Sequence, residues 1–274
     1  MLTLALVISV LGFLLVVASQ DAKPFSLDFA ALASSFAVGL FAQLVDGALG
    51  MGYGVTSNSL LLAAGLPPAS ATATVHVAKS FTGAASGLSH WRLGNVDKRI
   101  FGRLIVPGIL GTLVGVHVVT SIDGAVIRPW ISAYLLGMGL FILVRAFRTI
   151  RIALPDLKKL FPVAILGGFA DSVGGGGWGP VVTTTLIGSG HEPRTTIGSV
   201  NAAEFVISLA SGLSFTVLIG IQHWESVAGL VIGGIAIAPF AARLTHRIPR
   251  RAMMVAVGLL ISGLSIFSIV RAFA

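Results

Sequence analysis

Long apolar runs separated by short polar loops are the feature that most limits how this chain can fold. Of its 274 residues, 55% are hydrophobic and 10% are charged, a balance typical of proteins that reside in membranes. The sequence therefore predicts an all-α polytopic membrane protein in contact with lipid. The net charge of +8 does not indicate a nucleic-acid partner, because the basic residues lie in loops between the apolar runs.

The first apolar run, "LTLALVISVLGFLLVVA" at residues 2–18, has no basic residue in front of it and is apolar over nearly its whole length. Both features favour a retained transmembrane helix over a cleaved signal peptide. We therefore assign residues 1–28 to a leading transmembrane helix and an outer loop.

The rest of the chain contains two copies of one pattern. "DGALGMGYG" from Asp46 and "DSVGGGGWG" from Asp171 superpose at an offset of 125 residues, and the register continues without a gap. Of the 44 aligned pairs, 14 are identical, which indicates an internal duplication. We therefore expect a first repeat at residues 29–160 and a second repeat at residues 161–274, joined in one membrane domain.

Each repeat contains the same five segments in the same order. Two short pieces flank a glycine cluster, and three longer runs follow, each close to the ~20 residues that a helix needs to cross a bilayer. The expected segments are 29–45, 55–65, 70–90, 104–120 and 129–147 in the first repeat, and 161–170, 180–189, 195–215, 226–242 and 252–270 in the second.

Three basic clusters set the expected orientation of the repeats. Residues 92–103, 145–159 and 243–251 hold 13 of the 18 basic residues, and such clusters belong on the cytoplasmic side. All three can share that side only if the two short segments of a repeat enter and leave the membrane on one face. Each repeat then makes three net crossings, so the second repeat is inverted relative to the first. This topology predicts a cytoplasmic N-terminus and a periplasmic or extracellular C-terminus.

The glycine clusters predict the place of a substrate site. A helix that stops inside the membrane leaves main-chain groups that need protein, water or a ligand, and its N-terminus attracts anions. Glycine-interrupted segments at matching places in two inverted halves point to a transport site near the midplane. Close helix packing through G-x-x-x-G spacing is the alternative. The glycines assigned to substrate binding are Gly50, Gly52, Gly54, Gly175, Gly177 and Gly179.

Polar residues beside the glycine clusters have two interpretations each. Asp46 and Asp171 either cap the broken helices or carry a coupling ion or proton. Asn58 and Thr183 stand at matching positions after the breaks, and we assign them to substrate binding. Ordinary hydrogen bonds between helices would also explain those two side chains.

Lys79 lies near the middle of the expected segment 70–90, roughly 15 Å from either end, which is too far for its side chain to reach the membrane surface. It must therefore face the interior of the bundle. Glu204 stands at the matching position of the second repeat. The two either form a buried pair that joins the halves or handle substrate and protons. We assign Lys79 to substrate binding and Glu204 to proton coupling.

The same faces carry His76 and its counterpart Asn201, which we also assign to substrate binding. Because the pKa of an unperturbed histidine lies near neutrality, His76 suits a proton relay. A packed, hydrogen-bonded core histidine is the other interpretation.

With these features in place, residues 29–270 resemble the TauE/SafE family of anion exporters and permeases. The stretches that carry the resemblance are "GMGYGVTSNSLLLAAGLPPASATATVH", "SGLSHWRLGNVD" and "GGGGWGPVVTTTLIGSGHEPRTTIGSVNAAEF". The resemblance implies transport of small sulfur oxyanions or organosulfonates, such as sulfite or sulfoacetate, across the bacterial inner membrane.

The sequence therefore favours a secondary transporter that works by alternating access with proton coupling. ATP is not its energy source, because the chain has no Walker A motif. We expect no cofactor and no resident metal, and a homodimer is one assembly that the sequence allows.

There are three alternative functions: a carrier for another small anion, a divalent-cation carrier, and an intramembrane enzyme. The cation carrier would use Asp46, Asp171, His76 and Glu204 as ligands. The enzyme is not favoured, because the serine and aspartate contexts of intramembrane proteases are missing.

Overall fold

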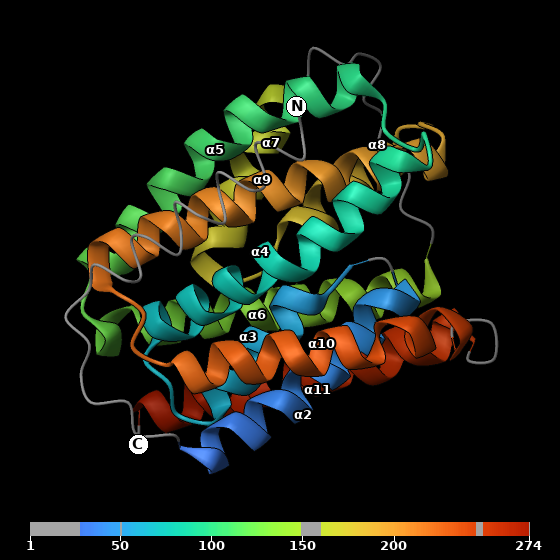
Figure 1. The fold of residues 1–274 in the computed structure, drawn as a ribbon. Coiled ribbons are helices and arrows are strands. Elements are labelled where there is room, and N and C mark those ends of the chain that lie inside the picture. Colours follow the sequence, from blue (N-terminus) through green and yellow to red (C-terminus); the bar gives the residue numbers. More distant parts are fainter. Residues whose placement is uncertain (1–27, 50, 149–159, 245–248, 274) are drawn as a thin grey trace.

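The computed structural model describes residues 28–49, 51–148, 160–244 and 249–273, and within these ranges every regular element is helical (Figure 1). The expected leading helix and Gly50 lie outside the described residues. The predicted all-α class is confirmed. The elements are α2 (Phe29–Leu49), α3 (Tyr53–Ala63), α4 (Pro68–Arg92), α5 (Lys98–Ser121), α6 (Gly124–Phe147), α7 (Leu160–Gly174), the π-helical turn η2 (Gly179–Thr183), α8 (Thr184–Gly188), α9 (Pro193–Ile219), α10 (Trp224–Leu244) and α11 (Arg250–Phe273).

Five of the described helices contain a stretch long and apolar enough to cross a membrane: α2, α5, α6, α9 and α11. The first segment of each repeat is predicted to be too short to cross the membrane as an ordinary helix. This agrees with α7, which has 15 residues. It is wrong for the length of α2, which has 21 residues because the helix continues through Asp46 instead of ending before it.

Several helices also begin before the apolar run that revealed them, because a polar residue caps the first turn. The Asp97 carboxylate accepts a hydrogen bond from the main-chain N–H of Arg99 at 2.7 Å and so starts α5 at Lys98. Asp123 caps α6 in the same way. An acceptor at this position satisfies a donor that the helix itself leaves free.

The two repeats interlock through α4 and α9, which run antiparallel at close range. Gly87 of α4 faces Ala202 of α9, and Gly212, near the other end of α9, faces Val77. Glycine at these contacts lets the two backbones approach each other. The two helices lie in the middle of the molecule (Figure 1), and their polar residues Lys79 and Glu204 meet there.

The remaining main contacts also join one repeat to the other. α2 packs along α10, α5 along α7, and α6 along α11. If the two repeats are exchanged, the α2–α10 contact becomes the α7–α5 contact, whereas the α4–α9 and α6–α11 pairs map onto themselves. This is the arrangement that two inverted copies would produce, and their inversion relative to the membrane stays a prediction.

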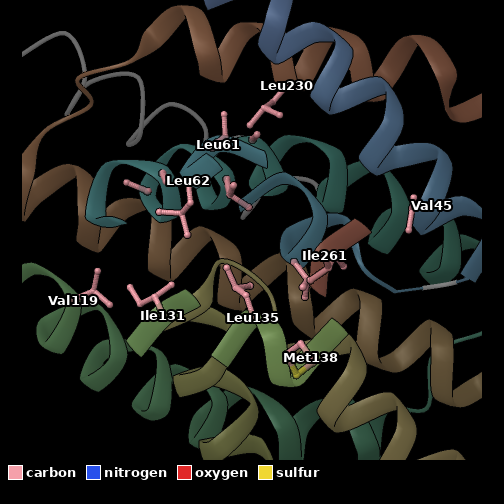
Figure 2. Close-up of a cluster of buried hydrophobic side chains, with 14 of the residues drawn as sticks. Val45, Leu61, Leu62, Val119, Ile131, Leu135, Met138, Leu230 and Ile261 are labelled. Atoms are coloured by element: carbon pink, nitrogen blue, oxygen red, sulfur yellow. The ribbon is translucent and has the colours of Figure 1, made fainter. Parts of the chain in front are cut away.

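The hydrophobic core is shared between the repeats, so neither has a separate core. Figure 2 shows Leu61 and Leu135 from the first repeat in one buried cluster with Leu230 and Ile261 from the second. Large apolar side chains also point outward. On α5, α6, α10 and α11 they include Val106, Trp130, Ile232 and Leu259, each more than half exposed. Such an outer surface suits contact with lipid.

Candidate functional site

The chain leaves the helical conformation at both glycine clusters. Gly52, between α2 and α3, has φ of 116°, and Gly175, between α7 and η2, has φ of 68°. Both lie in the left-handed region, which glycine occupies without the penalty that a Cβ would bring. We call the stretch from Met51 to Gly54 the first break and the stretch from Gly174 to Gly177 the second break, so that each includes the adjoining end of a helix.

The two breaks lie against each other, backbone to backbone. A Cβ added at Gly54 would overlap the carbonyl oxygen of Gly175, and one added at Gly176 would overlap the main chain of Gly54 and Val55. Gly179 leaves room for Met51 in the same way, since a Cβ there would lie 3.1 Å from that side chain. Close main-chain packing between the repeats is thus a function of Gly54 and of Gly176.

Asp171 caps the helix that begins at the second break. Its Oδ1 accepts hydrogen bonds from the main-chain N–H of Gly177 at 2.9 Å and of Trp178 at 3.2 Å. The matching contact recurs 125 residues earlier, where Tyr53 N–H donates to Asp46 Oδ1 at 3.4 Å. The capping interpretation therefore describes both aspartates, and Asp171 is the more tightly held.

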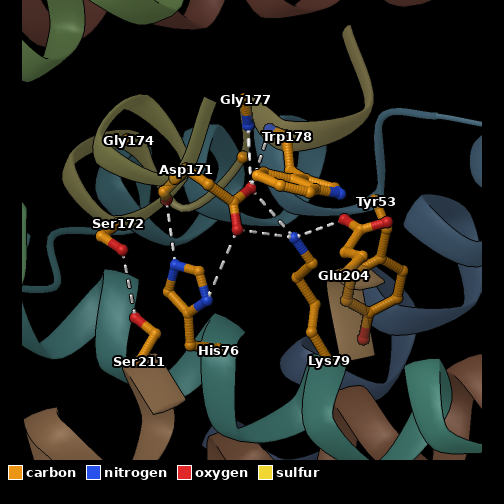
Figure 3. Close-up of polar contacts among 12 residues, drawn as sticks. Tyr53, His76, Lys79, Asp171, Ser172, Gly174, Gly177, Trp178, Glu204 and Ser211 are labelled. Carbon is orange, nitrogen blue, oxygen red and sulfur yellow. Dashed lines mark hydrogen bonds and ion pairs between the residues drawn. The ribbon is translucent and has the colours of Figure 1, made fainter. Parts of the chain in front are cut away.

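A buried ion cluster joins three helices beside the second break (Figure 3). The Lys79 ammonium of α4 lies 3.1 Å from Asp171 Oδ1 of α7 and 2.8 Å from Glu204 Oε1 of α9. The Lys79–Glu204 pair is one that the repeat alignment offered. Asp171 is a second partner of Lys79 that the sequence did not reveal, because that contact depends on how α7 packs against α4.

His76 braces the main chain at the start of the second break. Its Nε2 lies 2.9 Å from the carbonyl oxygen of Asp171, its Nδ1 lies 3.8 Å from Asp171 Oδ2, and its ring stacks on Phe215. The counterpart Asn201 donates to Ser86 Oγ at 3.4 Å. The two repeats therefore use this matched position differently.

Two further side chains of the first repeat hold the second break. Asn58 Nδ2 donates to the carbonyl oxygen of Gly174, and the Tyr134 hydroxyl donates to that of Gly176, both at 2.8 Å. Sequence analysis missed Tyr134 because α6 carries no glycine break or charge near this position. The predicted Thr183 is buried within η2.

A polar cavity of about 60 Å³ lies on the side of the first break. Four of the predicted site residues line it, together with five neighbouring residues. The lining residues are Gln43, Asp46, Tyr53, Lys79, Thr82, Gly83, Ser86, Asn201 and Glu204.

The carboxylates near the breaks are arranged around an ammonium group, with Lys79 between Asp171 and Glu204. In the part of the chain that the structure describes, no three His, Cys, Asp or Glu side chains are grouped closely enough to hold a metal ion. The contacts therefore place charged carboxylate oxygen atoms against N–H donors.

The sequence matches the family described as sulfite exporter TauE/SafE over residues 35–268. The chain belongs to the TauE/SafE family. A probable membrane transporter protein of Bacillus subtilis (strain 168), YtnM, is 42% identical over 230 residues, which is 81% of this chain and 77% of the relative.

A second relative, a probable membrane transporter protein of Haemophilus influenzae, is 26% identical over 196 residues, which is 66% of this chain and 75% of the relative. No solved structure matches the chain significantly. Membership of TauE/SafE and these names support a multi-pass membrane transporter for a small substrate.

Proposed function

We propose that this chain is a secondary transporter that moves a small sulfur-containing anion across the bacterial inner membrane by alternating access, coupled to protons. The observation that carries the proposal is the meeting of two helix breaks at the buried Lys79 ammonium, beside a polar cavity. An oxyanion requires fixed N–H and O–H donors and positive charge, and this arrangement supplies both.

The contacts of Asp171 support a site for anionic oxygen. One carboxylate oxygen lies at the two amide N–H groups of Gly177 and Trp178 and within 3.1 Å of the Lys79 ammonium. A sulfur oxyanion presents oxygen atoms of the same kind. It therefore competes with the protein's own carboxylates for Lys79, which has three N–H donors to share.

That competition gives a physical reason for proton coupling. An ionised carboxylate holds Lys79 strongly, whereas a protonated one loses most of this attraction. An anion that displaces a carboxylate from the ammonium consequently binds best when that carboxylate has taken up a proton. Anion and proton then move together, because the binding of either one favours the state of the protein to which the other binds more tightly.

The difference between the repeats supports alternating access. The cavity lies beside the first break, whereas the matching space beside the second break holds the contacts of Lys79 and His76 with Asp171. A conformational change could close the cavity beside the first break and open the matching space beside the second. The site would then open to the other side of the membrane, as expected for transporters built from inverted repeats.

Two other functions are less well supported. A divalent cation would have to displace Lys79 from Asp171 and Glu204 before those carboxylates became available to it. An intramembrane enzyme needs an activated nucleophile, whereas the Ser86 hydroxyl in the cavity accepts a hydrogen bond from the Asn201 amide.

A flux assay in sealed liposomes tests the proposal. The purified protein is given sulfite, sulfoacetate, sulfate, phosphate or chloride, with and without an inward proton gradient. We expect gradient-driven uptake of a sulfur anion without chemical change. Lys79→Ala removes a charge-assisted contact worth about 1.5–3 kcal/mol and should reduce uptake by about tenfold to hundredfold. Asn201→Ala should weaken uptake less, since Asn201 is uncharged.

The matched control is Gln222→Ala, which alters an exposed loop side chain far along the chain from the breaks. Elution as a single species in detergent shows whether each variant is folded. Unaltered flux in folded Lys79→Ala and Asn201→Ala would refute the proposed site. Uptake of divalent metal ions instead of anions would support the cation carrier.

A further inference from the structure

The second break is fastened to the first repeat at several points. Asn58 and Tyr134 each donate to one of its carbonyl oxygens, those of Gly174 and Gly176, at 2.8 Å. Moving this break would require both hydrogen bonds, the first buried and the second partly buried, to open together. Each such loss in a buried place is costly, because the freed carbonyl has no water to replace the donor.

The Asp171 side chain is equally restrained. It is fully buried, and Gly177, Trp178 and Lys79 all donate to its Oδ1, while His76 lies against its main-chain oxygen. A carboxylate with this many donors is stabilised as an anion and cannot turn toward a ligand without losing several of them. Asp171 therefore has the contacts of a fixed counter-ion for Lys79.

Asp46 has the matching position in the first repeat and a different environment. Its Oδ1 accepts a hydrogen bond from the Tyr53 N–H at 3.4 Å, which is long. Among the described residues, no salt bridge to Asp46 is seen. Asp46 instead lines the cavity with Glu204, whose side chain is 24% exposed while that of Asp171 is fully buried. A proton can reach an exposed carboxyl group more easily than a buried one.

The groups that act electrostatically on Asp46 are Glu204, Tyr53 and Lys79, and those that act on Glu204 include Lys79 and Asp171. From α10 and α11, which also pack against α2, no described side chain contributes a charge near Asp46. Two carboxylates, those of Asp171 and Glu204, therefore contact the Lys79 ammonium, and that of Asp46 interacts with it at longer range. A proton taken up by one of them reduces the negative charge that an incoming anion would meet.

We propose that the cavity beside the first break is the loading site for a compact oxyanion, and that Asp46 and Glu204, and not Asp171, exchange the transported proton. This proposal rests on the function proposed above. It gives different roles to two aspartates that stand at matching positions of a duplicated sequence. Asp171 holds Lys79 in place, while Asp46 and Glu204 respond to the proton supply.

The size and lining of the cavity indicate the kind of anion. Its volume of about 60 Å³ exceeds the ~10–15 Å³ that one water needs, but it leaves no space for a long carbon chain. Besides the carboxyl groups of Asp46 and Glu204, amide, hydroxyl and ammonium groups surround it. The lining donors are Lys79, Gln43, Asn201, Thr82 and Ser86. An oxyanion built on a single central atom suits this space better than a substituted sulfonate, and Gln43 and Thr82 limit its size.

The matched variants Asp46→Asn and Asp171→Asn test the assignment in the same liposomes. Uptake is measured with an inward proton gradient and with an anion gradient alone, and the ratio of the two rates reports coupling. Asp46→Asn and Glu204→Gln should each lower this ratio by about tenfold, which is equivalent to about 1.4 kcal/mol. Asp171→Asn should reduce both rates together and keep the ratio.

Thermal unfolding in detergent adds a readout that does not depend on transport. Asp171→Asn should lower the midpoint clearly, and Asp46→Asn should leave it near that of the wild type. If Asp171→Asn does not fold, Tyr134→Phe provides the milder test, because it loosens the second break without removing a charge. It should lower the unfolding midpoint and keep the coupling ratio.

The outcomes distinguish the two proposals. A coupling ratio that is lost in Asp171→Asn or Tyr134→Phe but kept in Asp46→Asn would overturn the assignment, and so would equal unfolding midpoints for the two aspartate variants. Wild-type protein that moves none of the anions would instead refute the proposed function. Gln43→Ala should raise sulfoacetate uptake relative to sulfite, and an unchanged preference would show that the cavity does not select by size.

Discussion

The contact between the two breaks makes Gly54→Ala a sharp test of the structure. A Cβ at this position would lie 2.8 Å from Gly176 Cα and closer still to the Gly175 carbonyl oxygen, whereas ordinary contacts begin at 3.4 Å. Relieving the Gly176 contact alone requires the breaks to separate by 0.6 Å, the difference between these distances, and the closer carbonyl contact requires more. A movement of that size along the hydrogen bond from Asn58 to Gly174 would stretch it from 2.8 Å to at least about 3.4 Å.

These effects can be converted into an expected loss of stability. Overpacking of this kind costs about 1–3 kcal/mol, and the weakened hydrogen bond adds about 1 kcal/mol. Alanine recovers up to about 1 kcal/mol through its higher helix propensity in α3. The net destabilisation is then about 1–3 kcal/mol, which lowers the unfolding midpoint by about 2–10 °C.

The assay is thermal unfolding of the purified protein in detergent, compared with Gly137→Ala. Gly137 lies on the exposed side of α6 with nothing within 4 Å of an added Cβ, so its replacement should keep or slightly raise the midpoint. Equal midpoints for Gly54→Ala and Gly137→Ala would show that the breaks do not touch, and the reasoning about their convergence would fail.

Three other predictions concern the ends of helices and the orientation of the repeats. Arg128 donates to the Leu66 carbonyl at 2.8 Å beyond the end of α3, so Arg128→Ala should lower the unfolding midpoint by a few degrees, equivalent to about 1 kcal/mol, while Arg148→Ala serves as the control. Hydrogen bonds from Thr195 and Arg194 lower the pKa of the exposed Glu192 below 4.5. The stabilisation from Glu192 is therefore present above the unfolded pKa and is lost as the pH falls through the lower folded value, so the midpoints of the wild type and Glu192→Gln should converge at acid pH; a constant difference would contradict this. Finally, single cysteines at Arg99 and Arg250 should react with an impermeant reagent from the same side of the membrane, and labelling from opposite sides would exclude the inverted topology.

Much of the fold can be read from the sequence because its signals are local. Apolar runs reveal the long helices, glycine clusters reveal both breaks, and the repeat alignment places Lys79 opposite Glu204. The length of α2 could not be read in this way, since the expected segment ends at residue 45 and the helix continues through Asp46 to Leu49.

The site was less predictable because its contacts depend on packing between helices that are distant in sequence. Asp171 reaches Lys79 across 92 residues, and the Tyr134 hydroxyl reaches Gly176 across 42. The alignment also suggests equal roles for Asp46 and Asp171. Their surroundings differ because His76 faces the second break, whereas its counterpart Asn201 donates to Ser86.

The absence of cysteine from the sequence allows a direct test of whether the cavity lies on the transport path. Ser86→Cys places one thiol in the cavity lining, and Ser132→Cys places one at a fully buried position of α6 outside it. We expect a small water-soluble thiol reagent to modify the first and not the second, and the transported anion to slow the modification. An unreactive Ser86→Cys, or a reaction rate that the anion leaves unchanged, would contradict a central anion path beside Lys79.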